Sequence, residues 1–549
     1  MDTPAVRKAR GAFFTPPILA DYIARWAIRR AGDTVFEPSC GDAAFLVPAA
    51  DRLRRLGAPH SLAGQLAGLD IHPASAEAAR RRLAAEGAEV HVETGDFFDR
   101  PVPEPLFRYD AVIGNPPYVR YQQFGGEARA KSRQAALAQG VRLTGLASSW
   151  AAFTIHASEF LKADGRLGLV LPAELLTVNY AAQVRRYLLK RFAFVKLVLF
   201  EELVFPGVLE DVVLLLAEGS GGAPHFEVYQ ARNLADLDRA GAWVGYTPGD
   251  GKWTPALLPT AALDIYQQLT EGPGFSTMLE AWGETYLGAV TGNNDFFTLT
   301  RPRATELGLA PRELLKISPP GSKHLRGLTF SGRAWDHLAR EGKRAFLFAP
   351  DACPSPAAKR YIAMGEAQGV QLGYKCRNRT PWWRVPLVER PDLLFTYMNH
   401  DRPRLVANDA GVQLLNSLYG VKLFETVREL GRELLPLACL NSATLLGAEV
   451  VGRAYGGGML KHEPKEADLL PVPAPSTLAA VAGRLRHTQV QIGGALRAAD
   501  PAAAVAIVDR VILQEHLGMS AEDIAGLRSA REHLFQRRVS RSRSERGNA

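Results

Sequence analysis

Residues Asp110-Ala111-Val112-Ile113-Gly114-Asn115-Pro116-Pro117-Tyr118 join a short apolar run to four polar or stiff residues. The apolar part, Asp110–Gly114, predicts a buried β-strand that the two prolines bring to an end. Open α/β folds bind their ligands at the carboxyl ends of the sheet strands. We therefore expect Asn115–Tyr118 to lie at a binding edge, although a rigid turn after a strand would have the same sequence.

The Asn115–Tyr118 segment carries the groups needed to hold a planar amino group. Asn115 offers a side-chain acceptor, the prolines leave free carbonyls, and Tyr118 supplies a flat ring. Hydrogen bonds from an amino group to the Asn115 side-chain oxygen and the Pro116 carbonyl would draw its lone pair out of ring conjugation and aim it at an electrophile. Tyr118 would stack on the base.

Short strands alternate with helices over residues 34–219, a pattern that predicts a parallel sheet with helices on both faces. The expected strands are Thr34–Pro38, Leu66–Ile71, Ala88–Val92, Asp110–Gly114, Leu167–Leu171, Val195–Phe200 and Val212–Ala217. The expected helices are Asp42–Leu56, Ser75–Glu86, Trp150–Lys162 and Ala181–Arg191.

Three earlier strands also end in residues that could bind a nucleotide-like cofactor. The turn around Gly41 lets the backbone approach such a ligand. Asp70 ends the second strand, where a carboxylate can accept both ribose hydroxyls. Asp96 follows the third and could accept from an adenine amino group beside the Phe97 backbone and ring. Each carboxylate alone is typical of a solvated turn, but four successive strand ends point to one ligand site.

In this order the motifs resemble the gamma-class adenine-N6 DNA methyltransferases, the TaqI-like group, and especially the larger type II restriction-modification enzymes. That class has a Phe-x-Thr-Pro segment first, which here reads Phe13-Phe14-Thr15-Pro16. The resemblance implies S-adenosylmethionine as cofactor, double-stranded DNA as partner, and methyl transfer to N6 of a flipped-out adenine. One departure is Ala43, which stands where the family usually has a second glycine.

The resemblance also implies roles for individual residues. Thr15 and Glu37 would hold the methionine part of the cofactor, Asp70 the ribose, and Asp96 with Phe97 the adenine. The full set of implied cofactor-binding residues is Thr15, Glu37, Ser39, Gly41, Asp70, Ile71, Asp96, Phe97 and Asn115. The implied catalytic residues are Asn115, Pro116, Tyr118 and, from the Val204–Gly207 segment, Phe205.

The composition changes after Gly219, which predicts a different second domain. Residues 374–384 there interleave cations with aromatic rings, as phosphate contact and base stacking require. The DNA-binding candidates are Lys375, Arg377, Arg379, Trp382, Trp383 and Arg384. A solvated basic loop over buried tryptophans is an equal alternative. From Ser476 long helices are expected, ending in a basic tail with Arg537 and Arg538 that should pack no core.

The sequence thus predicts an α/β chain in three parts. A Rossmann-like S-adenosylmethionine-dependent methyltransferase domain is expected over residues 1–220, and a mixed α+β target-recognition domain over residues 221–475. A helical C-terminal region is expected over residues 476–549.

Composition narrows the class of protein further. The chain has 549 residues, and 65 Lys and Arg against 57 Asp and Glu give a net charge of +8, a mild excess that suits a polyanionic partner. No apolar run is long enough to cross a bilayer and no secretory pattern opens the chain, so we expect a cytoplasmic, nucleoid-associated bacterial or archaeal protein, without membrane contact. The four cysteines are isolated, so neither a disulfide nor a metal site is expected.

Several alternatives remain at this point. A protein-glutamine N5-methyltransferase or a cytosine-N4 DNA methyltransferase would use the same amino-group chemistry. A fused nuclease is not expected, because only ten residues precede Gly11 and Glu341-Gly342-Lys343 has no acidic partner in the sequence pattern. A non-catalytic DNA-binding subunit is disfavoured by the intact Asn115–Tyr118 segment. We expect a monomer that works alone or with a separate cognate restriction endonuclease.

Overall fold

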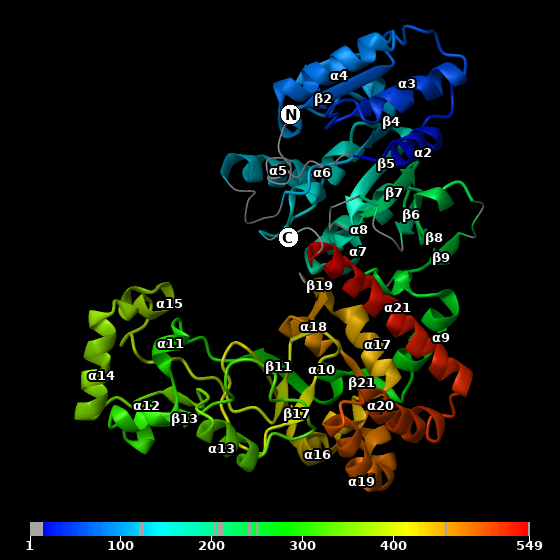
Figure 1. The fold of residues 1–549 in the computed structure, drawn as a ribbon. Helices are drawn as coiled ribbons and strands as arrows, with labels where there is room; N and C mark the ends of the chain where they lie inside the picture. The colour runs from blue at the N-terminus through cyan, green and yellow to red at the C-terminus, as the bar shows by residue number, and fades with distance from the viewer. Residues whose placement is uncertain are drawn as a thin grey trace. The chain divides into compact units, whose positions relative to one another are not determined.

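The computed structural model describes residues 15–119, 126–145, 147–200, 204–205, 212–239, 241, 243–248, 251–455 and 458–546. The chain divides into two compact units. The first runs up to Leu257 and includes the residues from Ser540 onward, and the second is Leu258–Val539. Figure 1 shows the elements of each unit along the chain.

The first unit is built on a nine-stranded sheet with the order β3-β2-β1-β4-β5-β7-β6-β8-β9. The strands are β1 (Val35–Glu37), β2 (Leu66–Asp70), β3 (His91–Thr94), β4 (Tyr109–Gly114), β5 (Leu161–Pro172), β6 (Phe194–Phe200), β7 (Val212–Glu218), β8 (Phe226–Ala231) and β9 (Val244–Tyr246). Strands β1 to β5 pair in parallel. The polar strand ends expected from the sequence therefore meet at one edge.

The sheet differs from the expected parallel arrangement at β7, which pairs antiparallel with both β5 and β6. The physical reason is the connection: only residues 201–211 separate β6 from β7, too few for the crossover that a parallel neighbour needs. Beyond residue 220, β8 pairs in parallel with β6, and β9 pairs with β8. The first unit therefore continues past the boundary expected at 220.

Helices cover the sheet of the first unit. They are α2 (Pro17–Ala27), α3 (Leu46–Arg55), α4 (Pro73–Ala85), α5 (Gly126–Ala138), α6 (Ser149–Ser158), α7 (Glu174–Thr177) and α8 (Ala182–Arg191). Helix α2 packs against β4 and β5, α4 against β2 and β3, and α6 against β5. Every residue of α6 is buried, which makes it an internal support beside β5 rather than a surface helix.

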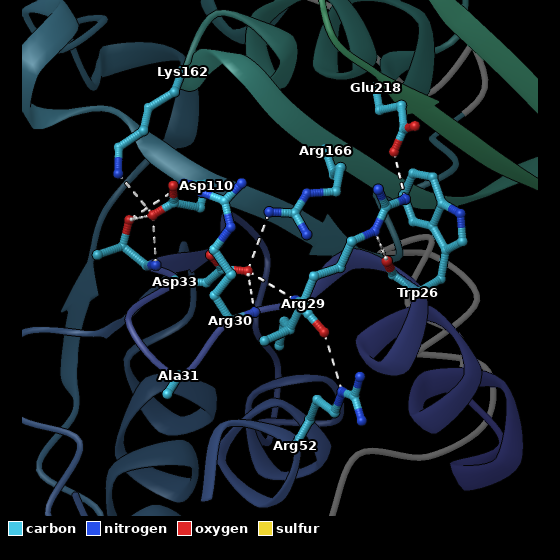
Figure 2. A network of polar contacts seen from close by, with 12 residues as sticks. Trp26, Arg29, Arg30, Ala31, Asp33, Arg52, Asp110, Lys162, Arg166 and Glu218 are labelled. Atoms are coloured by element: carbon cyan, nitrogen blue, oxygen red, sulfur yellow. Dashed lines mark hydrogen bonds and ion pairs between the residues drawn. The ribbon is translucent and has the colours of Figure 1, made fainter. Parts of the chain in front are cut away.

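The amino-terminal edge of the sheet, opposite the strand ends just described, is held by a polar network (Figure 2). Buried Asp33 accepts from the backbone N–H groups of Arg29 and Arg30 and from Arg166 Nη2 at 3.1 Å. Asp110 accepts from Thr34 and from Lys162 Nζ at 2.7 Å. Burial raises the pKa of Asp110, but the hydrogen bonds from Lys162 and Thr34 outweigh it and hold the pKa below its ordinary value. The network ties the turn before β1 to β4 and β5.

The second unit is a mixture of small sheets and helices. One antiparallel sheet has the order β11 (Gly283–Leu287), β18 (Tyr419–Leu423), β15 (Leu393–Phe395), β17 (Leu405–Ala407). The others are β12 (Thr298–Leu299), β14 (Phe346–Phe348) and β13 (Leu314–Lys316); β16 (Met398–Asn399), β20 (Met459–Lys461) and β19 (Arg453–Tyr455); and β10 (Phe275–Thr277) with β21 (Pro471–Pro473). The expected mixed α+β character is confirmed.

Helices surround these sheets and dominate the end of the chain. The short and mid-length ones are α9 (Thr260–Glu271), α10 (Met278–Ala281), α11 (Asn294–Phe297), α12 (Arg301–Glu306), α13 (Gly332–Arg340), α14 (Pro356–Ala367), α15 (Tyr374–Arg377), α16 (Arg428–Ala438), α17 (Ser442–Val451), α18 (Pro464–Asp468) and α20 (Pro501–Asp509). The long ones are α19 (Pro475–Arg497) and α21 (Ala521–Arg546). In the described residues no single helix could span a membrane, and one bent pair, α16 with α17, passes only by length and composition.

The end of the chain corrects one expectation. Arg537 and Arg538 are buried rather than part of a solvated tail. Arg538 forms an ion pair with Glu449 of α17 at 2.8 Å, with both side chains 3% exposed. Helix α21 carries Leu527, Ala530 and Leu534 on one buried face, and this apolar stripe draws the helix and its arginines into the second unit.

Candidate active site

Asn115 directly follows β4, and its two side-chain atoms have different environments. Its Nδ2 donates to the Thr15 hydroxyl at 3.2 Å, and its backbone carbonyl accepts from the Ser39 hydroxyl at 3.2 Å. Its Oδ1 is buried and accepts no hydrogen bond from any residue that the structure describes. Because an unpaired buried acceptor costs free energy, Oδ1 is a place for a donor that a ligand would bring.

Tyr118 is the last residue of the same loop and attaches it to β5. The side chain is 8% exposed, and its hydroxyl donates to the Val170 carbonyl of β5 at 2.8 Å. Pro116 is buried beside it. The hydrogen bond holds the Tyr118 ring in one orientation, so any ring face presented to a ligand is fixed before the ligand arrives.

Ser149, the first residue of α6, holds the loop in place and was not found from the sequence. Its hydroxyl donates to the Pro117 carbonyl and accepts from the Val119 N–H at 2.9 Å. Its own backbone N–H donates to the Val119 carbonyl at 3.1 Å. The Asn115–Tyr118 loop is thereby attached to the buried helix α6, and no local pattern around Ser149 could have signalled this.

Asp70 connects the ends of β1 and β2. Its Oδ2 accepts from the Gly41 N–H at 2.9 Å, and its Oδ1 accepts from the His72 N–H at 2.8 Å. Gly41 has a φ of +54°, a left-handed conformation that glycine adopts without strain. Each carboxylate oxygen keeps further lone pairs, so Asp70 can still accept from a ligand hydroxyl while it holds both loops.

Glu37 lies at the end of β1 and is almost fully buried. Its Oε2 accepts from the Leu46 N–H at 3.1 Å at the start of α3. Burial raises the pKa of Glu37 well above its ordinary value, and the hydrogen bonds from Leu46 and Phe45 lower it only in part. In the segment that joins Glu37 to Leu46, Ala43 has a φ of +68°. Glycine adopts this left-handed conformation without strain, which agrees with the glycine expected at this position from the family pattern.

The third strand end divides into a polar part and a buried ring. Asp96 accepts from the Phe98 N–H at 3.0 Å. The Phe97 ring packs among Phe36, Phe153, His156 and Phe160 and is buried, so the structure gives this ring to the core. His156 Nε2 lies 3.2 Å from the Phe97 carbonyl and fixes that backbone.

At the end of the second strand, next to Asp70, the side chain of Ile71 is 57% exposed and leaves an apolar surface free.

Two other expected regions fall at the limits of the described residues. Phe205 is 2% exposed, and the residues on either side of the Val204–Phe205 pair lie outside the described part of the chain. Phe13 and Phe14 of the expected Phe-x-Thr-Pro segment also lie outside it, while Thr15 is described and buried. The base contact expected of Phe205 stays a prediction.

The six DNA-binding candidates of the second unit separate into two groups. Lys375, Arg377 and Arg384 are exposed, and the first two lie over the Tyr374 ring. Arg379 donates to the Thr291 carbonyl at 2.8 Å and to the Val290 carbonyl. Trp382 and Trp383 pack against a hydrophobic cluster of this unit. The structure thus brings Arg379, Trp382 and Trp383 into internal packing, and it leaves the other three candidates at the surface.

The described residues contain no group of three or more His, Cys, Asp or Glu that could hold a metal ion. The cysteines are free thiols: Cys40, Cys376 and Cys439 are buried and Cys353 is exposed.

Comparison with known proteins gives matches over both units. Residues 2–221 match the family model of N-6 DNA methylases, and residues 250–513 match that of the C-terminal domain of the type II methyltransferase M.Eco57I. The type II methyltransferase M.XamI of Xanthomonas campestris pv. amaranthicola is 25% identical over 84% of this chain and 85% of its own. The type II methyltransferase M.AccI of Acinetobacter calcoaceticus is 22% identical over 65% of this chain and 68% of its own.

A solved structure is similar over nearly the whole chain. The type IIL restriction-modification enzyme MmeI, solved in complex with DNA, covers 93% of this chain and 73% of its own, with a TM-score of 0.55 and 13% identity. The fold and the match of residues 2–221 to the N-6 DNA methylase family model define a DNA methyltransferase. With the family models and the type II relatives, the chain is an adenine-N6 DNA methyltransferase of the type II restriction-modification kind. The protein-glutamine and cytosine-N4 alternatives are not favoured.

Proposed function

We propose that this chain transfers the methyl group of S-adenosylmethionine to N6 of a flipped-out adenine in duplex DNA, and that Asn115, Pro116 and Tyr118 form the reaction site. The observation that carries the proposal is the buried, unpaired Oδ1 of Asn115 at the carboxyl end of β4. Adenine N6 carries two N–H donors, and one of them would fill this vacancy in the hydrogen-bonding pattern.

The residues of the loop would prepare the amino group for attack. Asn115 Oδ1 and the Pro116 carbonyl would each accept one N–H, which draws the nitrogen lone pair out of conjugation with the ring and toward the electrophile. When bound, S-adenosylmethionine supplies that electrophile as a methyl group on a positively charged sulfur. Transfer would form the N–CH3 bond as the S–CH3 bond breaks, with the electron pair of the broken bond staying on sulfur, and a proton would then leave the nitrogen for water.

Tyr118 and Ser149 would keep this geometry rigid. The Tyr118 hydroxyl is held by Val170, which limits reorientation of the ring that is proposed to stack on the adenine. Ser149 fixes the carbonyl of Pro117 and the N–H of Val119, and so limits movement of the loop that carries the two acceptors on Asn115 and Pro116. Preorganised acceptors are effective because they need no rearrangement during the reaction.

The strand ends next to the loop fit the cofactor. A side chain added at Gly41 would meet no atom within 4 Å, so there is open space above this turn. Asp70 would accept the ribose hydroxyls, and the exposed side chain of Ile71 would cover one face of the adenine ring. The residues proposed to hold the cofactor are Thr15, Glu37, Ser39, Gly41, Asp70, Ile71, Asp96 and Asn115, together with the backbone of Phe97.

DNA contact is proposed for the second unit. Flipping a base out of a duplex costs a few kcal/mol, so groove and phosphate contacts must hold the opened DNA. Lys375, Arg377 and Arg384 are exposed cations that can contact phosphates. Arg379, Trp382 and Trp383 would shape the segment that carries them, because their side chains are used in packing.

The biological setting follows from the relatives. Two type II methyltransferases match most of this chain, which supports a modification enzyme that protects DNA from a separate cognate restriction endonuclease, or a solitary one. We propose that it acts as a monomer on chromosomal DNA, and hence in the cytoplasm. As part of the same proposal, we assign the chain to the gamma class of adenine methyltransferases.

The experiment is methylation of duplex DNA by the purified chain with methyl-labelled S-adenosylmethionine, followed by digestion to nucleosides. We expect the label in N6-methyladenine, and mapping of the modified adenines should give one short recognition sequence. Label in N4-methylcytosine, or in added ribosomal or release-factor protein instead of DNA, would overturn the proposal. Thermal unfolding with and without S-adenosylmethionine tests cofactor binding separately.

A further inference from the structure

A small cavity in the second unit lies far along the chain from the strand-end site and has an unusual charge. Its volume is about 20 Å3, and its walls come from the segment before α13, the segment that leads into β17, and the ends of α16 and α19. Part of the wall is apolar, with Leu328, Pro436 and Leu440 among its residues. Three arginines, Arg326, Arg402 and Arg404, also line it.

Arg402 is the residue that needs an explanation. It is 8% exposed, and its buried Nε has no hydrogen-bond partner among the described residues. Burying a guanidinium N–H without an acceptor is unfavourable, and buried arginines are normally paired with a carboxylate or with several carbonyls. Burial lowers the pKa of Arg402 to about 10, which still leaves the side chain charged at neutral pH.

The charges next to Arg402 act on its guanidinium in both directions. Asp401 is the nearby carboxylate, and its Oδ1 is already paired with Arg404 at 2.9 Å. Asp401 attracts the charge of Arg402, whereas Arg404 and Arg531 both repel it. Arg531 donates to the Asp401 carbonyl at 2.8 Å, and Arg538 donates to the His400 carbonyl at 3.1 Å, so α21 fixes this crowded segment. The positive charges are thus held together by the fold.

The size and the opening of the cavity limit which ligand could neutralise the arginine charges that line it. A cavity needs about 10–15 Å3 to hold one water molecule, so this one has room for a group of one or two oxygen atoms. Arg326 and Gly327 are exposed, which places the mouth of the cavity at the surface. A phosphodiester presents two non-bridging anionic oxygens of this size, and guanidinium is its preferred partner.

We propose that the Arg402 cavity binds a phosphate oxyanion, and that a DNA backbone phosphate supplies it during methylation. The second part rests on the proposed DNA-binding function. The site would add one buried phosphate contact to the exposed cations Lys375, Arg377 and Arg384. It carries no base specificity, because a phosphate is the same at every nucleotide.

The test compares the wild-type chain with Arg402→Met, which keeps much of the side-chain volume and removes the charge. The control is Arg333→Met, which removes one exposed arginine from α13 of the same unit. Relieving an unpaired buried charge should raise the Tm of Arg402→Met by about 2 °C or more, whereas Arg333→Met should leave the Tm unchanged. A lower Tm for Arg402→Met would mean that Arg402 supports the fold, and would overturn the proposal.

Inorganic phosphate tests the site without DNA. Phosphate should raise the Tm of the wild type and of Arg333→Met more than sodium chloride does at equal ionic strength. Arg402→Met should show only the general salting effect of phosphate. Equal responses of all three proteins would overturn the site. This result does not depend on whether the chain binds DNA, so it stands apart from a failure of the proposed function.

Binding to a duplex then tests the source of the phosphate. For Arg402→Met, the Kd for DNA should rise about tenfold, and the slope of log K against log salt should fall by about 0.9, the value for one lost phosphate contact. If inorganic phosphate stabilises the wild type through Arg402 but the Kd and the salt slope are unchanged in Arg402→Met, the site takes a free anion and the DNA source is wrong.

Discussion

The side-chain amide of Asn115 donates to the hydroxyl of Thr15 at 3.2 Å, joining residues 100 positions apart. The bond fixes which way the amide points, and it leaves Oδ1 buried and facing no donor from the described residues. The start of the described chain and the end of β4 are thus coupled through the side chain that carries one of the two proposed amino-group acceptors. The consequences of this arrangement can be tested residue by residue.

Ser149→Ala should slow methylation without weakening cofactor binding. The variant loses the hydroxyl that bonds both the Pro117 carbonyl and the Val119 N–H, so the catalytic loop becomes less well positioned. We expect kcat to fall about ten- to a hundredfold, with the Kd for S-adenosylmethionine unchanged. Steady-state kinetics and calorimetry measure the two quantities.

Ser158→Ala is the matched control in the same helix. Its hydroxyl bonds the Ile155 carbonyl and Tyr187, away from the loop. It should lose some stability and keep its kcat. An equal fall of kcat in both variants would show that Ser149 acts only through the stability of α6.

Asp70→Ala should weaken cofactor binding more than catalysis. The carboxylate holds the Gly41 and His72 N–H groups and is proposed to accept the ribose hydroxyls. Charged hydrogen bonds contribute about 1.5–3 kcal/mol, so KM for S-adenosylmethionine should rise about ten- to a hundredfold. Asp99→Ala removes an exposed carboxylate of the same unit and should leave KM unchanged. A normal KM for Asp70→Ala would exclude the ribose role.

Ala43→Gly should be tolerated unusually well. Ala43 has a φ of +68°, where an alanine is strained by about 1–2 kcal/mol and a glycine is not. This relief offsets the lost methyl packing and the greater freedom of glycine in the unfolded chain, so stability should change by less than about 1 kcal/mol. Ala50→Gly, also buried but inside α3, should lose about 1–2 kcal/mol in a denaturant titration. An equal loss of unfolding free energy in Ala43→Gly and Ala50→Gly would contradict the proposed backbone strain at Ala43.

His324 should make stability depend on pH. Burial lowers its pKa to about 4, whereas an unfolded histidine titrates near about 6.5. Between these values the unfolded chain binds more protons than the folded one, so the free energy of unfolding should fall as the pH drops from about 6.5 to 4. His324→Gln should reduce this fall, and His516→Gln, at an exposed position, should not. A pH profile of thermal unfolding measures both.

Much of the first unit could be predicted because its signals are local. Each expected strand from Thr34 to Ala217 overlaps a strand of the structure, since short apolar runs between turn residues define them. The antiparallel pairing of β7 could have been inferred from the short 201–211 connection. The alternation of strands with helices along the chain, taken alone, favours parallel pairing. Strands β8 and β9 follow a glycine-rich break that suggested a boundary, and they join the sheet through pairing with distant β6.

The site shows the same division between local and distant information. The Asn115–Tyr118 loop, the Gly41 turn and Asp70 meet at one edge because parallel strands end together. Ser149 was missed because its contacts reach 30 and 32 residues back along the chain. Arg537 and Arg538 looked solvated because Arg and Ser dominate the local sequence, yet Glu449, 89 residues away, provides the buried partner of Arg538.

The most direct test of the account is single-turnover methylation of duplex DNA by Asn115→Ala beside the wild type, with cofactor binding measured on both proteins. Without the side-chain acceptor, the adenine amino group keeps its lone pair in the ring, so N6-methyladenine should form at least about a hundredfold more slowly. The Kd for S-adenosylmethionine should stay close to that of the wild type. A near-normal rate of N6-methyladenine formation by Asn115→Ala would contradict the account.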